Sequence, residues 1–489
     1  MRHTCIDATG SSVCFRLPHL RARVWVVAFS SVLLCIDAQP VIALDGLRLL
    51  AYFAVNDTSS PPGPSVLPVP GGMVDSGAPL PSASNLYSET YWTAFADLDL
   101  PTLVKAARTG PEARFAEAMT LLATGNHESA ESAFVAVSQQ AGDLNVVVAA
   151  QVMLATTLRY EGKWKKLRDI SLNTRLGPED RKVTSDLERW GKAFATAEQQ
   201  VVAFPDKAVT LPLKLTAVGT PTIHVRINGK DYDFWLDTGS SVTVVSSAVA
   251  ADAEIAALSP DTVLVRTFAG TVPVRAVSVK RVEIGSIVFT NSPAVVIDES
   301  LMYMRETGPS ARAGGIRVDG IIGWDTIRQL DLWMDYYGGT VLLRRPAARG
   351  TSGTSAQNLA WLGKPLVEVR TKGGIKLHFT IDTGAESSFL NAIVLEKTGI
   401  ATKLADNRVF GIARTGRETD RVVPFLRIEV GGKSLRLPDV IVYGPVTSGL
   451  INCDGILGSD IARFGEVHID ATNGLFSIGR SDGGEDPAE

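Results

Sequence analysis

The stretches Phe234-Trp-Leu-Asp-Thr-Gly-Ser-Ser241 and Thr380-Ile-Asp-Thr-Gly-Ala-Glu-Ser387 decide the fold of this chain. In each of them an Asp-Thr-Gly triplet ends a run of apolar and β-branched residues, which is typical of a strand. An aspartate in this position is held in a partly buried turn, where its surroundings tune its pKa. The two acids, Asp237 and Asp382, are 382 − 237 = 145 residues apart, which suggests a carboxylate pair made by duplication.

The sequence around the two triplets repeats in the same order. A Gly-x-Pro segment, an Asp-Gly-Ile-(Ile/Leu)-Gly run and a terminal hairpin occur first at 219–221, 319–323 and 334–343, and again at 363–365, 454–458 and 469–478. One Asp-Thr-Gly is expected by composition in roughly one of ten chains of this length. Two copies with matching flanks indicate an internal duplication.

The duplicated unit resembles the lobe of retropepsin- and pepsin-type aspartic proteases, over about Lys207 to Arg480. Retroviral versions are homodimers of one lobe, whereas this chain supplies both. The resemblance implies an all-β double-lobed fold, with two retropepsin-like β-barrels and one aspartate from each at the floor of a cleft. We predict lobes at 207–346 and 358–481, joined by a flexible connector at 347–357, with a disordered tail at 482–489.

The chemistry of peptide hydrolysis without a metal explains why two acids are needed. Two carboxyl groups in contact share one proton, because both cannot readily ionise. One then activates water as a base while the other protonates the carbonyl oxygen. We predict Asp237 and Asp382 as these catalytic acids.

The residues that follow each acid are predicted to support it. Gly239 and Gly384 allow the backbone to approach the carboxylates closely. Thr238 and Thr383 carry hydroxyl groups which, by the resemblance, bond across the lobe junction; ordinary buried threonines are the alternative.

The position after each glycine differs between the two copies. We expect Ser240 to donate a hydrogen bond to Asp237, which Ala385 cannot do for Asp382. Asp382 is therefore predicted to hold the shared proton more often, and the pH optimum to be mildly acidic.

A hairpin over the cleft is expected in each lobe. Phe268 and Gly270 in the first lobe, and Phe410 and Gly411 in the second, are candidate flap residues that contact substrate, with local packing of the phenylalanines as the alternative. An extended peptide would bind there mainly by main-chain pairing.

Three other residues of the lobes have simpler interpretations. Asp319 and Asp454 lack a following Thr-Gly and are predicted to be structural rather than catalytic. Cys453 is expected to be a small core residue.

The composition excludes several classes of function. The net charge of −4 and the pI near 6.0 give no nucleic-acid footprint. The six histidines and four cysteines have no metal-binding spacing. We predict no metal, no cofactor and no nucleic-acid partner.

The N-terminal part is expected to direct export. Arg21 and Arg23 precede an apolar run, Val24 to Cys35, of the length of a signal-peptide core, and residues 41–43 suit a cleavage site. Residues 1–43 are predicted as a signal peptide, leading to the periplasm or the extracellular space. An uncleaved signal anchor, which would tether the chain to a membrane, is the alternative. Residues 44–88 are rich in Pro, Gly and Ser and are predicted as a linker.

Helical periodicity predicts an α-helical domain at 89–205. Ala118, Gly125 and Phe134 follow the spacing of a helix–turn–helix unit, and a second turn glycine, Gly162, lies 162 − 125 = 37 residues on. This pattern resembles tetratricopeptide repeats, with a plain helical bundle as the alternative. Either arrangement offers a surface for substrates or a partner protein.

These observations together predict a multidomain α+β protein: an exported aspartic endopeptidase that acts on a peptide or protein substrate. A non-catalytic peptide-binding module, and a scaffold that works through its helical repeats, are the two alternatives.

Overall fold

A computed structural model describes the greater part of the chain after residue 89. The described residues are 90–140, 143–170, 187–216, 219–267, 270–304, 316–349, 357–411, 414–443, 446–448 and 450–479, with short strands at 26–28, 43–44 and 47–48. The predicted tail 482–489, and most of the predicted leader 1–43, linker 44–88 and connector 347–357, lie outside these ranges.

A helical domain comes first. Its helices are α2 (Thr90–Ala96), α3 (Leu100–Ala106), α4 (Gly110–Ala123), α5 (His127–Ser138), α6 (Leu144–Tyr160) and α7 (Trp164–Asp169), and residues 187–193 are also helical. Thr109 and Glu112 form a capping box at the start of α4, which satisfies backbone N–H groups that a helix end leaves free. Gly125 and Gly162, at φ 73° and 69°, turn the chain from α4 to α5 and from α6 to α7. These helix pairs agree with a helical domain, while the repeat itself stays a prediction.

The first lobe is a closed six-stranded barrel. Its sheet runs β11-β12-β9-β15-β8-β7, and β7 pairs back to β11. The strands are β7 (Pro221–Ile227), β8 (Lys230–Leu236), β9 (Thr243–Ser246), β11 (Gly270–Ile284), β12 (Ile287–Ile297) and β15 (Gly320–Ile322). The same sheet also includes β10 (Ala257–Thr267), β6 (Lys214–Leu215) and β4 (Val201–Ala203). Helix α9 (Ser247–Asp252) follows β9, and α10 (Trp324–Ile327) follows β15. β4 falls inside the range predicted for the helical domain, yet it pairs with β12, so the chain joins the first lobe before residue 205.

The second lobe repeats this barrel strand for strand. The ring runs β23-β24-β21-β27-β20-β19, and β19 pairs back to β23. The strands are β19 (Pro365–Thr371), β20 (Lys376–Ile381), β21 (Phe389–Asn391), β23 (Arg414–Val430), β24 (Lys433–Tyr443) and β27 (Gly455–Leu457). The sheet also includes β22 (Lys403–Gly411), β18 (Leu359–Trp361) and β1 (Val26–Ala28), while α11 (Ile393–Thr398) and the 3-10 helix η1 (Ser459–Phe464) match α9 and α10. In both lobes the central strand, β15 or β27, pairs in parallel with the strand that leads to Asp-Thr-Gly. The predicted duplication into two barrels is therefore confirmed.

The two lobes share a five-stranded sheet. Its order is β29-β28-β16-β17-β5, with strands β5 (Val209–Pro212), β16 (Asp331–Asp335), β17 (Thr340–Arg344), β28 (Glu466–Asp470) and β29 (Leu475–Gly479). Trp333 and His468, which are equivalent in the two copies, face each other across β16 and β28 and stack with ring centroids 3.8 Å apart. The approximate two-fold axis that relates the lobes therefore passes through this pair.

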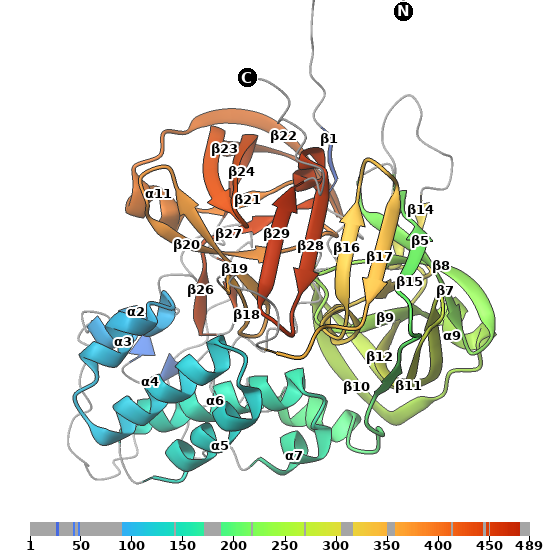
Figure 1. The fold of residues 1–489 in the computed structure, drawn as a ribbon, viewed down its shortest axis with the longest axis horizontal. Coiled ribbons are helices and arrows are strands. Elements are labelled where there is room, and N and C mark those ends of the chain that lie inside the picture. The colour runs from blue at the N-terminus through green and yellow to red at the C-terminus, as the bar shows by residue number, and fades with distance from the viewer. Residues whose placement is uncertain are drawn as a thin grey trace, which may run out of the picture.

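Figure 1 shows the arrangement: the second lobe in orange and red, the first lobe in green, the shared sheet between them, and the blue-to-teal helices packed along one side of both lobes. Three two-stranded sheets complete the described structure: β2 (Ala43–Leu44) with β3 (Leu47–Arg48), β13 (Tyr303–Met304) with β14 (Ile316–Arg317), and β25 (Val446–Ser448) with β26 (Ile451–Cys453). Among the described residues, no helix has the length and apolar character needed to cross a membrane.

Candidate active site

Asp237 and Asp382 occupy matching turns at the ends of β8 and β20. The backbone N–H of Asp237 donates to the carbonyl of Ile322 in β15, and that of Asp382 donates to Leu457 in β27, at 3.1 and 2.9 Å. These hydrogen bonds therefore fix the two turns to the Ile-Ile-Gly and Ile-Leu-Gly strands, β15 and β27. Both acids are 0% exposed.

Thr238 and Thr383 join the two turns. The backbone N–H of each threonine donates to the hydroxyl of the other, at 3.0 Å in both directions. The hydroxyl of Thr383 also donates to the carbonyl of Leu236 at 2.6 Å. The bonds across the lobe junction that the resemblance implied are thus present, and they fix one turn relative to the other.

Each glycine of the triplets lies against the acid of the opposite lobe. A Cβ atom at Gly239 would lie 2.4 Å from Cγ of Asp382, and one at Gly384 would lie 2.5 Å from Oδ2 of Asp237. Real Cβ atoms do not approach other atoms this closely, so only glycine fits at either position. The close approach predicted for these residues is reciprocal between the lobes.

Burial and mutual repulsion shift the titration of the pair. Burial, followed by the negative charge of Asp382, raises the pKa of Asp237 well above that of an ordinary aspartate, against opposing hydrogen bonds from the N–H groups of Gly239 and Ser240. The carboxyl group of Asp382 lies within hydrogen-bonding reach of Asp237. Two carboxyl groups this close titrate as one unit that retains a proton.

The expected role of Ser240 is wrong. Its hydroxyl donates to the carbonyl of Val242 at 2.7 Å rather than to Asp237, because the chain turns back toward β9 directly after the glycine. Ala385 instead donates its backbone N–H to Oδ1 of Asp382 at 3.0 Å, beside a second bond from Gly384. Asp237 receives the equivalent pair of backbone bonds, from Gly239 and Ser240. The two acids therefore have matching donors, and the predicted preference of Asp382 for the shared proton loses the hydrogen bond on which it was based.

A second pair of acids supports the turns and was missed in the sequence. In the first lobe the hydroxyl of Thr243 donates to Asp325 at 2.9 Å and accepts from Gly323 N–H. In the second lobe Ser388 does the same between Asp460, at 2.6 Å, and Gly458. The signal was available, since 388 − 243 = 145 and 460 − 325 = 135 match the spacings of the duplicated landmarks.

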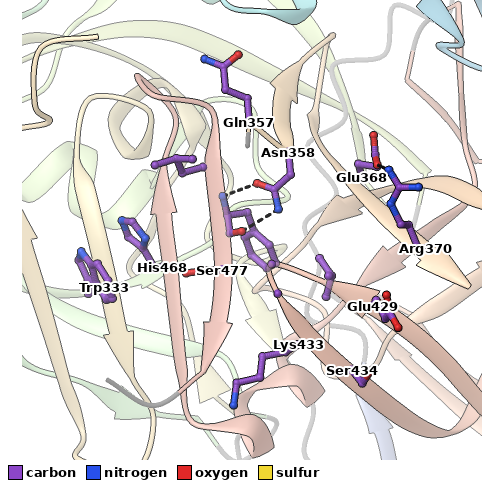
Figure 2. A pocket seen from close by; sticks show the side chains of 15 residues that line it. Trp333, Gln357, Asn358, Glu368, Arg370, Glu429, Lys433, Ser434, His468 and Ser477 are labelled. Atoms are coloured by element: carbon purple, nitrogen blue, oxygen red, sulfur yellow. Dashed lines mark hydrogen bonds and ion pairs between the residues drawn. The ribbon is translucent and has the colours of Figure 1, made fainter. Parts of the chain in front are cut away.

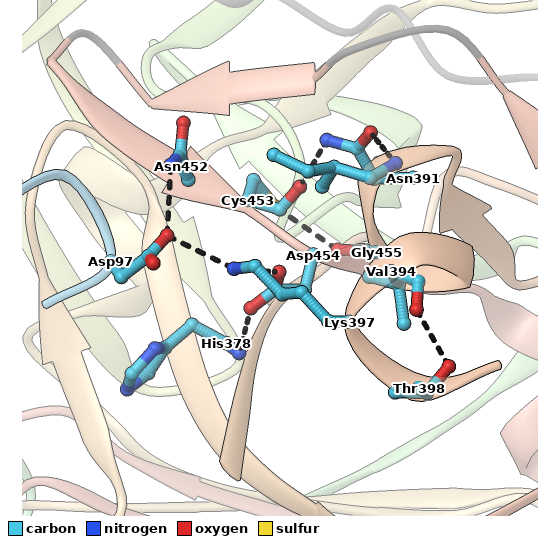
Figure 3. A network of polar contacts seen from close by, with 11 residues as sticks. Asp97, His378, Asn391, Val394, Lys397, Thr398, Asn452, Cys453, Asp454 and Gly455 are labelled. Carbon is cyan, nitrogen blue, oxygen red and sulfur yellow. Dashed lines mark hydrogen bonds and ion pairs between the residues drawn. The ribbon is translucent and has the colours of Figure 1, made fainter. Parts of the chain in front are cut away.

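Asp319 and Asp454 lie outside the acid pair. Oδ2 of Asp454 accepts from His378 N–H at 2.9 Å, and its Oδ1 lies 3.2 Å from Nζ of Lys397, a network shown in Figure 3. Asp319 lies 3.7 Å from Arg317. Cys453 is a buried free thiol, as expected of a core residue.

The candidate flap residues fall on two hairpins. Gly270 begins β11 and pairs with Thr267 of β10, while Phe268 lies outside the described residues. Phe410 and Gly411 end β22, opposite Thr415 and Arg414 of β23. The hairpins exist where they were predicted, and substrate contact by these residues stays a prediction.

A large hollow lies elsewhere, beside the shared sheet. It has a volume of about 920 Å³ and is lined by residues that include Trp333, Asn358 and His468, but by neither catalytic candidate (Figure 2). Asn358 exchanges two 2.9 Å hydrogen bonds with the backbone of Phe476, so its side chain caps the outer strand β29. In the described part of the chain, no group of three or more His, Cys, Asp or Glu residues is placed to hold a metal ion.

Comparison with known proteins gives a family match and likenesses to solved structures. Residues 223–326 match a family model described as aspartyl protease. A crystal structure of a retropepsin-like aspartic protease from Rickettsia conorii is 16% identical, covers 30% of this chain and 92% of that chain, and has a TM-score of 0.19. That score is too low to contribute to the assignment. Comparison with curated proteins gives no match. The chain is therefore similar to aspartyl proteases over residues 223–326, within the first lobe, and the second lobe repeats the same barrel.

Proposed function

We propose that this protein is an aspartic endopeptidase, in which Asp237 and Asp382 together catalyse hydrolysis of a peptide bond of the substrate. The observation that carries the proposal is the reciprocal placement of the turns: each Asp lies against the Gly of the other lobe. A binding module would not need two buried acids in contact, because burying a second carboxyl group beside the first costs free energy.

In the proposed reaction the two acids have complementary roles. Asp382 takes a proton from the attacking water. Asp237, whose pKa is raised, gives its proton to the carbonyl oxygen of the peptide. The tetrahedral intermediate, a gem-diol, then collapses as its C–N bond breaks: one of its hydroxyl groups returns a proton to Asp237, and the proton held by Asp382 passes to the leaving amine. Water is the only molecule consumed besides the peptide, and both carboxyl groups end in their starting protonation states.

Digestion of a peptide library by the purified protein, with and without pepstatin, tests the proposal. We expect cleavage at internal peptide bonds between about pH 3 and 7, where a carboxyl pair retains one proton. Failure of the folded protein to cleave any peptide in this range would exclude the activity. The cleavage sites also identify the substrate peptide for the experiments below.

We further propose that the protein is exported. The support is the charged and apolar pattern of residues 21–43 alone. N-terminal sequencing of the protein from fractionated cells tests this, because a mature chain that begins near residue 44 in the exported fraction is expected. An intact N-terminus in a membrane fraction would favour the signal anchor instead.

A further inference from the structure

The helical domain packs against the side of the first lobe that carries the catalytic acid. Successive side chains of a strand point to opposite faces, so Trp235 shares the face of Asp237, whereas Phe234 and Leu236 point into the barrel. Phe234 and Leu236 belong to the apolar cluster of the barrels. Trp235, which is 2% exposed, instead belongs to one continuous cluster with the core of the helices.

Neighbouring strands show the same division. Val244 and Ile321 belong to the cluster of the helices, while the adjacent Val245 and Ile322 belong to the barrel core. The catalytic face of the first lobe is therefore buried in continuity with the helical domain.

The second lobe differs at the equivalent positions. Phe389 and Ile456, the counterparts of Val244 and Ile321, form a small separate cluster with Ala385, Val422 and Ile441, all from the second lobe. The helical domain thus breaks the approximate two-fold symmetry of the lobes.

A polar contact joins the helices to the catalytic turn of the first lobe. Arg159, in the last turn of α6, donates to the hydroxyl of Ser241 at 2.9 Å, and its guanidinium lies over the ring of Trp190. Ser241 is four residues beyond Asp237 on the catalytic turn. The two-fold axis between the acids places its counterpart, Glu386, on the opposite side of the acid pair. Arg159 therefore holds the helices against the catalytic turn of the first lobe, on one side of the acid pair.

The helices also grip the second lobe. Asp97, after α2, bonds to Lys397 and Asn452, both at 2.9 Å, and Lys397 continues to Asp454 (Figure 3). The counterpart of Asp454 is Asp319, which pairs with Arg317 of its own lobe. Among the described residues, the bridge to the helices is thus present at one of the two equivalent loops and not at the other.

An aromatic stack joins all three parts. Tyr160 of α6 stacks on Trp361 of the second lobe at 5.1 Å, and Trp361 stacks on Trp324 of the first lobe at 5.7 Å. The lobes and the helices are therefore packed as one unit on this side.

We propose that the helical domain closes one end of the substrate cleft, so that the protease cleaves close to one terminus of a polypeptide. This rests on the proposed peptidase activity. A peptide bound across the acids extends freely past one end of the cleft and meets the helices at the other. Arg159 is a positioning residue in this arrangement, since it acts through Ser241.

The test uses the peptide that library digestion selects, prepared in four forms: unextended, and extended by about six Gly/Ser residues, roughly 20 Å, on the N-terminal side, on the C-terminal side or on both. We expect extension on one side, and on both sides, to lower kcat/KM at least about tenfold, while extension on the other side has little effect. Equal tolerance of extension on the two sides would overturn the proposal.

Two variants connect the effect to the helical domain. The double substitution Asp97→Ala/Arg159→Ala removes the two polar contacts described above between the helices and the lobes. It should reduce the loss of kcat/KM that extension of the peptide causes, called the length penalty below. Arg168→Ala is the matched control, because Arg168 is an exposed residue of α7 that pairs only with its neighbour Asp169 among the contacts described. The length penalty of this variant should equal that of the unmodified protein. An unchanged penalty in the double variant would contradict closure by the helices.

A binding measurement separates this inference from the peptidase activity itself. The same four peptides are titrated against the Asp237→Asn variant, and extension on one side only is expected to lower the affinity, without catalysis. Failure to cleave the unextended peptide would contradict the peptidase activity. Equal affinities for the peptides extended on either side would contradict only the closure of one end by the helices.

Discussion

Gly239 of the first lobe lies directly against the carboxyl group of Asp382 of the second, where an added Cβ would come within 2.4 Å of Cγ. Gly384 stands in the same relation to Asp237. The four residues interlock, so the position of each acid depends on the absence of a side chain in the other lobe. This relationship makes the two barrels one catalytic unit.

Gly239→Ala should therefore displace Asp382 and lower kcat/KM for peptide cleavage by about 100-fold or more, because a displacement of about 1 Å at reacting groups has effects of this size. Circular dichroism should show that the variant still folds. Gly110→Ala is the control, since a Cβ there meets no atom within 4 Å. Activity of Gly239→Ala equal to that of this control would contradict the interlocked geometry.

The reciprocal hydrogen bonds between Thr238 and Thr383 predict that two substitutions of Thr383 differ in their effect on stability. Thr383→Val leaves the N–H of Thr238 and the carbonyl of Leu236 without their partner, which should cost roughly 2 to 4 kcal/mol of unfolding free energy. Thr383→Ser keeps the hydroxyl and should lose less than half of this. Urea unfolding measures both values, and equal losses would show that the hydroxyl does not join the lobes.

Ser240→Ala distinguishes the observed hydrogen bond from the one expected in the sequence. Because the hydroxyl donates to the carbonyl of Val242, its loss should reduce stability by about 1 kcal/mol and leave the acidic limb of the pH–rate profile in place. An upward shift of that limb would mean that Ser240 acts on Asp237 after all. The profile is measured with the library-selected peptide.

Asp325 should make stability depend on pH. Burial raises its pKa from 3.8 to about 7, against the opposing hydrogen bond from Thr243 and the charge of Arg328. A carboxyl group with a raised pKa binds more protons in the folded state, so stability is highest below pH 4 and falls as the pH rises toward 7. Asp237 and Asp460 also have raised pKa values and contribute to the same decline. Asp325→Asn, which still accepts from Thr243, should therefore reduce the decline between pH 4 and 8, by on the order of 4 kcal/mol.

Urea unfolding at a series of pH values checks this expectation. Asp252→Asn is the control, since hydrogen bonds from Lys230 and Tyr232 lower the pKa of that exposed carboxyl, and the decline should persist there. A decline of unchanged size in Asp325→Asn would contradict the role given to Asp325.

The sequence predicted those parts of the structure that depend on local pattern and on repetition. The repeated Asp-Thr-Gly and Gly-Ile-(Ile/Leu)-Gly segments led directly to the two barrels, since a strand, a turn and a glycine each have a local physical requirement. The hydrogen-bond acceptor of a single hydroxyl group has no such local requirement. Ser240 donates to the carbonyl of Val242 because of the path of the strand that follows it.

Contacts between domains were beyond prediction for a similar reason. Arg159 and Ser241 are separated by 241 − 159 = 82 residues, and nothing in either neighbourhood marks the other. The Thr243–Asp325 and Ser388–Asp460 pairs are intermediate, because the spacings that revealed the duplication also place these residues in register. Comparison of the two copies position by position would have found them.

The substitution Asp237→Asn, assayed with the library-selected peptide, tests the acid pair most directly. Asp319→Asn is the matched control, because Asp319 precedes a Gly-Ile strand but lies outside the pair. We expect Asp237→Asn to fold as the unmodified protein does and to lose cleavage by a factor of about 1,000 or more, while Asp319→Asn stays within about threefold of it. Cleavage by folded Asp237→Asn at the rate of the unmodified protein would contradict catalysis by Asp237 and Asp382.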